Sequence, residues 1–250
     1  MQQIKKGLAT VACLLSYCFA FAQDAPPASV DTTYWQNSLS IGVNFSQAQF
    51  SDNWKAGGVN SIAIGSVITG TANYQKGKVS WANEADLQYG IVRNAEIGER
   101  KSVDRILLDS KLGFDISQYW NGFFSLNFLT QFTPGYRYEE NAQGGENAIT
   151  ISRFMAPAFL TTALGFEYKP SKVFWVRLSP FSPRFTFVTD DLLFLNEPSN
   201  YGVEPGETVR TEWLAAQVQA SLDKEIVENV TLKSRYQLFA NYENMAFNRI

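Results

Sequence analysis

The segment VSWANEADLQYGI, residues 79–91, alternates apolar and polar side chains with a period of two. Val79, Trp81, Leu87 and Ile91 share one parity, and most residues of the other parity are small, polar or charged. Because successive side chains of a β-strand point to opposite faces of a sheet, this segment predicts a strand with one apolar and one polar face.

The same period recurs along the chain and predicts an all-β protein with nine strands. In the seventh strand the apolar parity changes where Pro180 and Pro183 stand, and we interpret this change as a β-bulge. The nine predicted strands are residues 38–46, 61–74, 79–91, 105–116, 122–132, 160–168, 173–188, 214–226 and 230–242.

The connections between the predicted strands alternate between long and short. The long ones are residues 47–59, 94–104, 134–154 and 190–209, and the short ones are residues 75–78, 117–119, 169–172 and 227–229. Tight turns at one end and longer loops at the other are typical of an antiparallel transmembrane β-barrel of the outer-membrane type. A soluble β-sandwich is the competing interpretation, but its connections would not be expected to alternate between short and long.

Aromatic side chains gather at the ends of the predicted strands. Beside the short turns, on the apolar parity, we expect an aromatic girdle at the periplasmic interface of a membrane. The alternative is that aromatic residues, 14% of the chain, are simply common in strands. The residues of this girdle are Tyr74, Trp81, Trp120, Tyr168 and Phe174, and those of a second girdle at the other strand ends are Tyr89, Phe132 and Tyr242.

The N-terminus has the pattern of a secretory signal peptide. Lys5 and Lys6 precede an apolar run that ends in a small-x-small cleavage site at residues 20–22. We therefore predict a signal peptide at residues 1–22, a periplasmic lead-in at residues 23–37 and the barrel domain at residues 38–250. Cleavage would remove both cysteines of the chain, and an exported protein without disulfides depends on hydrogen bonds and packing alone.

The composition excludes several kinds of function. The chain of 250 residues contains no histidine, which excludes histidine bases, His-dependent triads and His-ligated metals. The formal net charge of −3 argues against nucleic acid as a partner, and loss of the signal lysines makes the chain more acidic. We therefore expect a protein that is not an enzyme and has no catalytic residues, metal or cofactor.

A motif in the first long loop connects the chain with a known family. Residues 50–61 read FSDNWKAGGVNS, and this segment resembles the Asn-Trp-x-x-Gly-Gly-x-Asn-Ser signature of the DUF3078 family of Bacteroidetes outer-membrane proteins. Further stretches are similar to that family, and the likeness covers nearly all of the chain after the signal. These stretches are residues 104–105, 131–136, 156–160, 187–191 and 225–230.

The resemblance implies an outer-membrane β-barrel, but it supplies no catalytic residues, because the function of the family is unknown. It also implies about three further strands, giving about twelve, whereas single-chain bacterial barrels have an even number of strands. Nine predicted strands and the ending Phe247-Asn248-Arg249-Ile250 therefore lead us to expect a barrel that is incomplete at its C-terminus.

The same loop motif has two interpretations. Asn53, Trp54, Gly57 and Gly58 are best explained as a turn with an aromatic anchor, although an outer loop that contacts a ligand is the alternative. The glycine pair is not a phosphate-binding loop, because no strand and helix flank it.

The polar parity of the strands carries charges of both signs. We interpret them as a salt-bridge network that fills the lumen, since the interiors of small barrels are polar and filled. Pairs such as Glu84 with Asp86, or Asp109 with Asp115, are only a weak indication of acid/base catalysis. The predicted lumen charges are Glu84, Asp86, Arg105, Asp109, Lys111, Asp115, Glu167, Arg177, Asp223, Lys233, Arg235 and Glu243.

These features predict an outer-membrane protein with a structural or accessory role in the envelope and a plugged polar lumen. Its partners would be outer-membrane lipid and other envelope proteins, which it would contact through the loops at residues 141–145 and 192–207. The alternative is a channel or binding barrel for small polar solutes.

Overall fold

A computed structural model describes residues 34–51, 53, 58–142, 144–196, 200–228, 230–242 and 246–249. The chain divides into two compact units, Met1–Thr33 and Tyr34–Ile250, and the described residues belong to the second unit. The predicted signal peptide, most of the lead-in, Trp54, Gly57 and Glu243 lie outside the described residues.

The described residues form 14 strands and two short 3-10 helices. The strands are β1 (Trp35–Ala48), β2 (Ser61–Lys76), β3 (Val79–Asn94), β4 (Gly98–Asp115), β5 (Trp120–Thr130), β6 (Gly135–Glu140), β7 (Glu146–Ser152), β8 (Ala158–Tyr168), β9 (Phe174–Phe181), β10 (Arg184–Phe187), β11 (Val209–Glu212), β12 (Ala215–Val227), β13 (Val230–Asn241) and β14 (Ala246–Arg249). The helices are η1 (Asp191–Leu195) and η2 (Asn200–Gly202). None of the described helices is long and apolar enough to cross a membrane.

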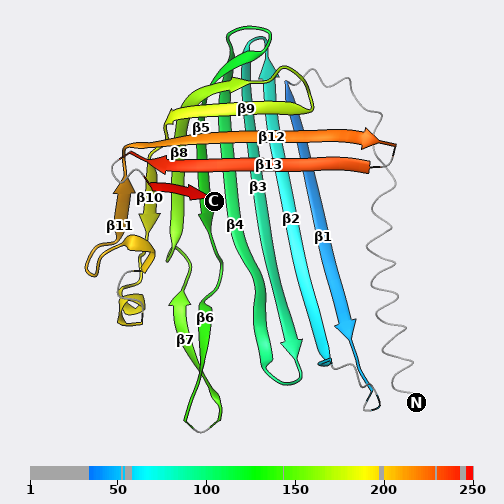
Figure 1. Cartoon of the computed structure of the whole chain (residues 1–250), viewed down its shortest axis with the longest axis vertical. Helices are drawn as coiled ribbons and strands as arrows, with labels where there is room; N and C mark the ends of the chain where they lie inside the picture. The colour runs from blue at the N-terminus through cyan, green and yellow to red at the C-terminus, as the bar shows by residue number, and fades with distance from the viewer. Residues whose placement is uncertain are drawn as a thin grey trace. The chain divides into compact units, whose positions relative to one another are not determined.

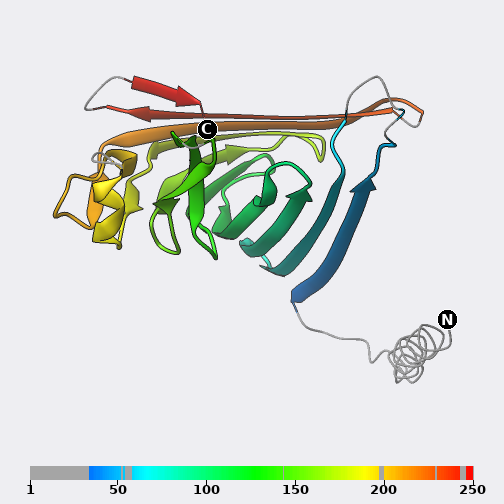
Figure 2. The same ribbon diagram turned by 90° about the horizontal axis from the view of Figure 1, so that it is seen from below.

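One large antiparallel sheet contains twelve of these strands, in the order β1-β2-β3-β4-β5-β8-β9-β12-β13-β14, with β10 and β11 attached beside β8 (Figure 1). The hairpin of β6 and β7 forms a separate sheet. The large sheet curls strongly, so that β12 and β13 pass over the trough formed by the earlier strands (Figure 2). The all-β antiparallel prediction is confirmed.

The sheet is not closed into a barrel in the described part of the chain. Its hydrogen-bonded path ends at β1 on one side and at β14 on the other, and no described pairing joins these two edges. Closure needs a ladder between the first and last strands, whereas the local period-two pattern reports only which face of each strand is apolar.

All nine predicted strands are present, with several differences. The prediction of a long connection at residues 94–104 is wrong, because β3 extends to Asn94 and β4 begins at Gly98, which leaves a tight turn at residues 95–97. The predicted alternation of short and long connections fails at this point, and β14 was not predicted. The first strand begins at Trp35, earlier than predicted, because Trp35 pairs with Tyr74 of β2. The seventh is divided into β9 and β10, which both pair with β8 across an irregular register. The long connections predicted at residues 134–154 and 190–209 contain secondary structure of their own, namely β6, β7, η1, η2 and the start of β11.

The largest apolar surface of the sheet faces outward rather than into a core. Leu39, Ile41 and Val43 of β1 are 70%, 66% and 69% exposed. The same parity is exposed on the other strands, at Ile62, Ile64, Ile68, Leu108, Leu112, Phe114, Phe124, Leu126, Leu164, Phe166, Leu178, Ile226, Leu232 and Tyr236. A small enclosed core lies among the loops instead, where Ala156, Val188, Leu193 and Val203 pack together.

Candidate lumen site

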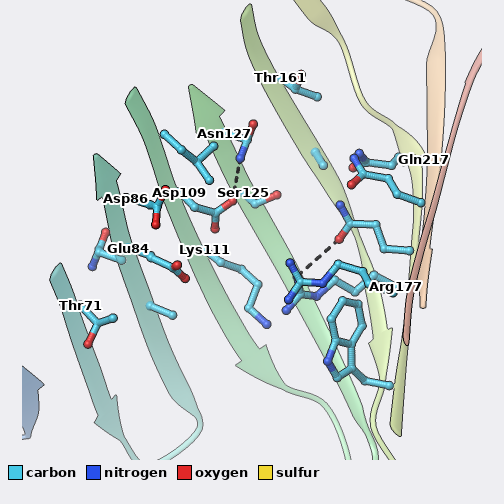
Figure 3. Close-up of a pocket in the computed structure, with 18 of the residues that line it drawn as sticks. Thr71, Glu84, Asp86, Asp109, Lys111, Ser125, Asn127, Thr161, Arg177 and Gln217 are labelled. Carbon is cyan, nitrogen blue, oxygen red and sulfur yellow. Dashed lines mark hydrogen bonds between the residues drawn. The ribbon is translucent and has the colours of Figure 1, made fainter. Parts of the chain in front are cut away.

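A polar cavity of about 620 Å³ lies on the concave face of the sheet. Its wall is built by side chains from β2, β3, β4, β5, β8, β9, β12 and β13, and these residues, except Asn83, are on the parity opposite to the exposed apolar residues (Figure 3). The period-two pattern explains this arrangement, because each strand presents alternate residues to the cavity.

Carboxylates line the side of the cavity formed by β3 and β4. Glu84 and Asp109 are directly opposite each other in the β3–β4 ladder, and both reach the cavity. Asp109 accepts a hydrogen bond from Nδ2 of Asn127 at 3.1 Å. Asp86, two residues from Glu84, lies 3.7 Å from the guanidinium of Arg105. Glu84 and Asp109 thus form no ion pair among the described residues.

A buried carboxylate joins two cations near the short-turn end of the sheet. Glu167 of β8 is only 4% exposed. It accepts hydrogen bonds from Nε of Arg177 at 2.5 Å and from Nζ of Lys111 at 2.9 Å. The guanidinium of Arg177 also lies 4.1 Å from the ring centroid of Trp175. These contacts fix both cations against the wall of the cavity.

The remaining predicted lumen charges are placed differently. Arg235 of β13 reaches the cavity, together with Gln217, Gln219 and Gln237. Lys233 and Asp223 form an exposed ion pair of 3.2 Å that does not line it. Asp115 lies at the end of β4, opposite Asn121 of β5.

The predicted single network is therefore divided into separate groups in the described structure. Seven of the predicted residues line the cavity, and Glu167, which does not line it, binds two of the seven. The seven are Glu84, Asp86, Arg105, Asp109, Lys111, Arg177 and Arg235. The division arises because register decides which charges meet, and register is a property of paired strands rather than of one strand.

The amide-bearing residues and Trp175 were not among the predicted site residues. The same pattern could have found them, since Trp175 shares its parity with Arg177, and Gln217 and Gln219 share theirs with Asp223.

The aromatic residues beside the short turns lie in two contacting groups. The ring centroid of Trp35 lies 5.2 Å from that of Tyr74 and 5.7 Å from that of Trp81. Trp120 and Tyr168 face each other across β5 and β8, with centroids 5.0 Å apart. Phe174, the fifth predicted member, begins β9 opposite Leu222 of β12. Trp35 was missed because the strand was predicted to begin after it.

Comparison with known proteins gives one match, to a family model. Residues 45–136 match the model of a family described as Protein of unknown function (DUF3078). The match covers less than half of the chain, and over that segment the chain is similar to the DUF3078 family. No curated protein and no solved structure matches it. The matched segment includes the cavity residues Glu84, Asp86 and Asp109, whereas Glu167 and Arg177 lie beyond it.

Two of the stretches that resemble the family, residues 104–105 and 131–136, meet beyond the end of β5. The carboxylate of Asp104 accepts hydrogen bonds from the backbone N–H of Phe132 at 2.7 Å and from that of Thr133 at 2.9 Å. Nζ of Lys101 donates to the same carboxylate at 2.8 Å. Asp104 therefore holds the start of the long loop that leads into β6 and β7.

The first long loop is described only in part. Asn53 lies in an exposed turn, and Gly58 has a φ of 148°. A Cβ on Gly58 would come within 2.6 Å of the ring of Phe50, whose backbone N–H donates to Oδ1 of Asn60. The positive φ of Gly58 thus favours glycine at this position, while Trp54 and Gly57 lie outside the described residues.

Proposed function

We propose that this protein is a member of the DUF3078 family and forms the wall of an outer-membrane β-barrel whose polar concave face lines a compartment for small polar solutes. It is exported through a cleaved signal peptide at residues 1–22 and performs no catalysis. The single observation that carries the membrane placement is the exposed apolar surface that runs across the strands from β1 to β13.

The extent of that surface is the main argument. Water-soluble monomers rarely expose contiguous apolar patches of more than a few hundred Å². Here large apolar side chains are exposed on one face of strand after strand, while the other face carries the charges. Alternation between lipid-facing apolar and lumen-facing polar residues is the pattern of membrane barrels. The contacting aromatic groups at Trp35 and Trp120 support an interface at the short-turn end.

Insertion also sets a condition on the sheet edges. Lipid offers no hydrogen bonds to backbone groups, so the edges at β1 and β14 must be paired in the membrane. Closure of the sheet is accordingly part of the proposal.

The cavity favours a solute compartment rather than a filled lumen. Its volume of about 620 Å³ lies in the range of small-molecule sites. Glu84 and Asp109 face it without an ion-pair partner in the described residues, although a filled lumen would be expected to neutralise them. A plugged structural barrel is the second candidate, supported by the tightly bound group of Glu167, Lys111 and Arg177.

Two measurements test the proposal. The full chain should fractionate with the outer membrane and be released by detergent, and recovery as a soluble periplasmic monomer would contradict the membrane placement. In planar bilayers a solute compartment should give stable conductance. Absence of conductance in correctly inserted protein would favour the plugged candidate.

A further inference from the structure

The charges around the cavity are separated by sign. Its uncompensated carboxylates, Glu84 and Asp109, project from β3 and β4, while Arg177 projects from β9 on the opposite side (Figure 3). Arg235 adds a second cation from β13. The cavity therefore has an acidic side and a basic side rather than a uniform charge.

The ion pairs preserve this separation. Asp86 is compensated by Arg105 on the acidic side, which leaves the charges of Glu84 and Asp109. Lys111 projects from β4 but binds Glu167 of β8, which Arg177 of β9 also binds, so this group of three retains one positive charge. Arg235 forms no ion pair among the described residues.

The distance between the two sides limits the size of a matching solute. Three strand spacings separate β4 from β9 in the order β4-β5-β8-β9, or about 14 Å along the sheet, and curvature shortens the direct path. An extended peptide advances about 3.3–3.6 Å per residue, so a chain of about three or four residues spans this gap.

The wall of the cavity also carries primary amide side chains. Asn127 of β5 lies between β4 and β9 and donates to Asp109, while Gln217 and Gln219 come from β12, where Gln219 is opposite Arg177. Each primary amide side chain provides both donors and an acceptor, and can pair with the N–H and C=O groups of a peptide backbone.

We propose that the cavity binds short zwitterionic peptides, with the ammonium group toward Glu84 and Asp109 and the carboxylate toward Arg177 and Arg235. This inference rests on the proposed solute compartment and names its substrate class. Charges of opposite sign on two sides of the cavity favour a solute with a positive charge at one end and a negative charge at the other. A neutral solute pairs with neither side, and a singly charged solute pairs with only one.

The test uses the full chain, extracted from membranes with detergent and studied by calorimetry and in vesicles. The probes are trialanine, its N-acetyl form, its C-terminal amide and the form blocked at both ends. Trialanine should bind about tenfold more tightly than the doubly blocked form, because hydrogen bonds between charged groups exceed neutral ones in strength. Uptake into vesicles should follow the same order, with sucrose as a neutral solute for comparison.

Variants assign each end of the peptide. The double variant Glu84→Gln/Asp109→Asn should abolish the preference for probes with a free ammonium group, and Arg235→Gln should weaken the preference for probes with a free carboxylate. Lys233→Gln, in the exposed pair outside the cavity, is the matched control and should retain both preferences. Arg235→Lys should restore the carboxylate preference in part.

The outcomes separate this inference from the proposed function. Equal uptake of all four probes and sucrose would overturn the inference and leave the solute compartment intact. Preferences that survive in the cavity variants would also overturn it. If neither sucrose nor any peptide enters the vesicles and no peptide binds, both the inference and the solute compartment fail.

Discussion

Glu84 of β3 and Asp109 of β4 stand directly opposite each other in the antiparallel ladder, and both side chains face the same cavity. Like charges in opposite positions destabilise a sheet. The described chain places no cation in an ion pair with either carboxylate. This arrangement costs stability and leaves two negative charges available to a solute.

Replacing Glu84 by Gln should therefore stabilise the protein. Relief of the repulsion predicts a free energy of unfolding higher by about 0.2–1 kcal/mol, measured by urea denaturation in detergent. The gain should shrink at high salt, because screening already weakens the repulsion. Glu84→Asp keeps the charge and serves as control, and a lower stability for Glu84→Gln would contradict the argument.

Glu167→Gln should have the opposite effect. The substitution leaves Lys111 and Arg177 beside a neutral group in a buried position, and the loss of one partner of a buried ion pair costs about 3–5 kcal/mol. Asp223→Asn breaks the exposed pair with Lys233 and should cost about 0–1 kcal/mol. Similar unfolding midpoints for the two variants would show that Glu167 is not a structural centre.

Arginine at Leu164 tests the membrane face. This side chain is 56% exposed on the apolar parity, and a lipid-facing arginine near the middle of the membrane costs about 2–4 kcal/mol. Leu126→Arg on the neighbouring strand should behave in the same way. Asn127→Arg places the same charge in the cavity, next to Asp109, and should cost much less. Equal effects on folding into lipid vesicles would argue against lipid contact.

Gly165→Ala tests the irregular register between β8 and β9. A Cβ at this position would lie 2.1 Å from the carbonyl oxygen of Leu178, which is backbone and has little room to move. Overpacking of this kind costs about 1–3 kcal/mol in the free energy of unfolding. At Gly42 the nearest atom to an added Cβ is 4.0 Å away, so Gly42→Ala should be neutral or slightly stabilising.

The contacts of Asp104 predict an effect of pH on the outer loop, beyond the proposed membrane-spanning part of β4. Burial would raise the pKa of Asp104, but the hydrogen bonds from Lys101 and from the N–H groups of Phe132 and Thr133 lower it below its ordinary value. Because the pKa is lower in the folded loop, the ionised carboxylate stabilises that loop at pH values above the ordinary pKa of 3.8. This stabilisation is lost as the pH falls through the lowered pKa of the folded state.

Hydrogen exchange of the Phe132 and Thr133 amides, corrected for intrinsic rates, provides the measurement. Their protection should be constant at neutral pH and fall below about pH 4. Asp104→Asn should reduce the protection already at neutral pH and remove its dependence on acid. Protection that persists in acid would show that other contacts hold this loop.

The sequence by itself determined the positions of nine strands and which face of each is apolar, but not β6, β7 and β14 or the early start of β4. The alternation in residues 79–91 is a local property, because side chains of a strand point to opposite faces whatever the strand pairs with. For this reason the cavity parity of Glu84, Arg177 and Arg235 followed from the printed residues. The motif at residues 50–61 likewise indicated the DUF3078 family.

Only the tertiary structure decided which of these charges meet. Lys111, Glu167 and Arg177 come from β4, β8 and β9, and their contact depends on the register of several strands and on the curvature of the sheet. The opposition of Glu84 and Asp109 also depends on register, where a shift of one residue would turn one side chain to the other face. The separation of the cavity into acidic and basic sides therefore arises from long-range pairing, which no local pattern encodes.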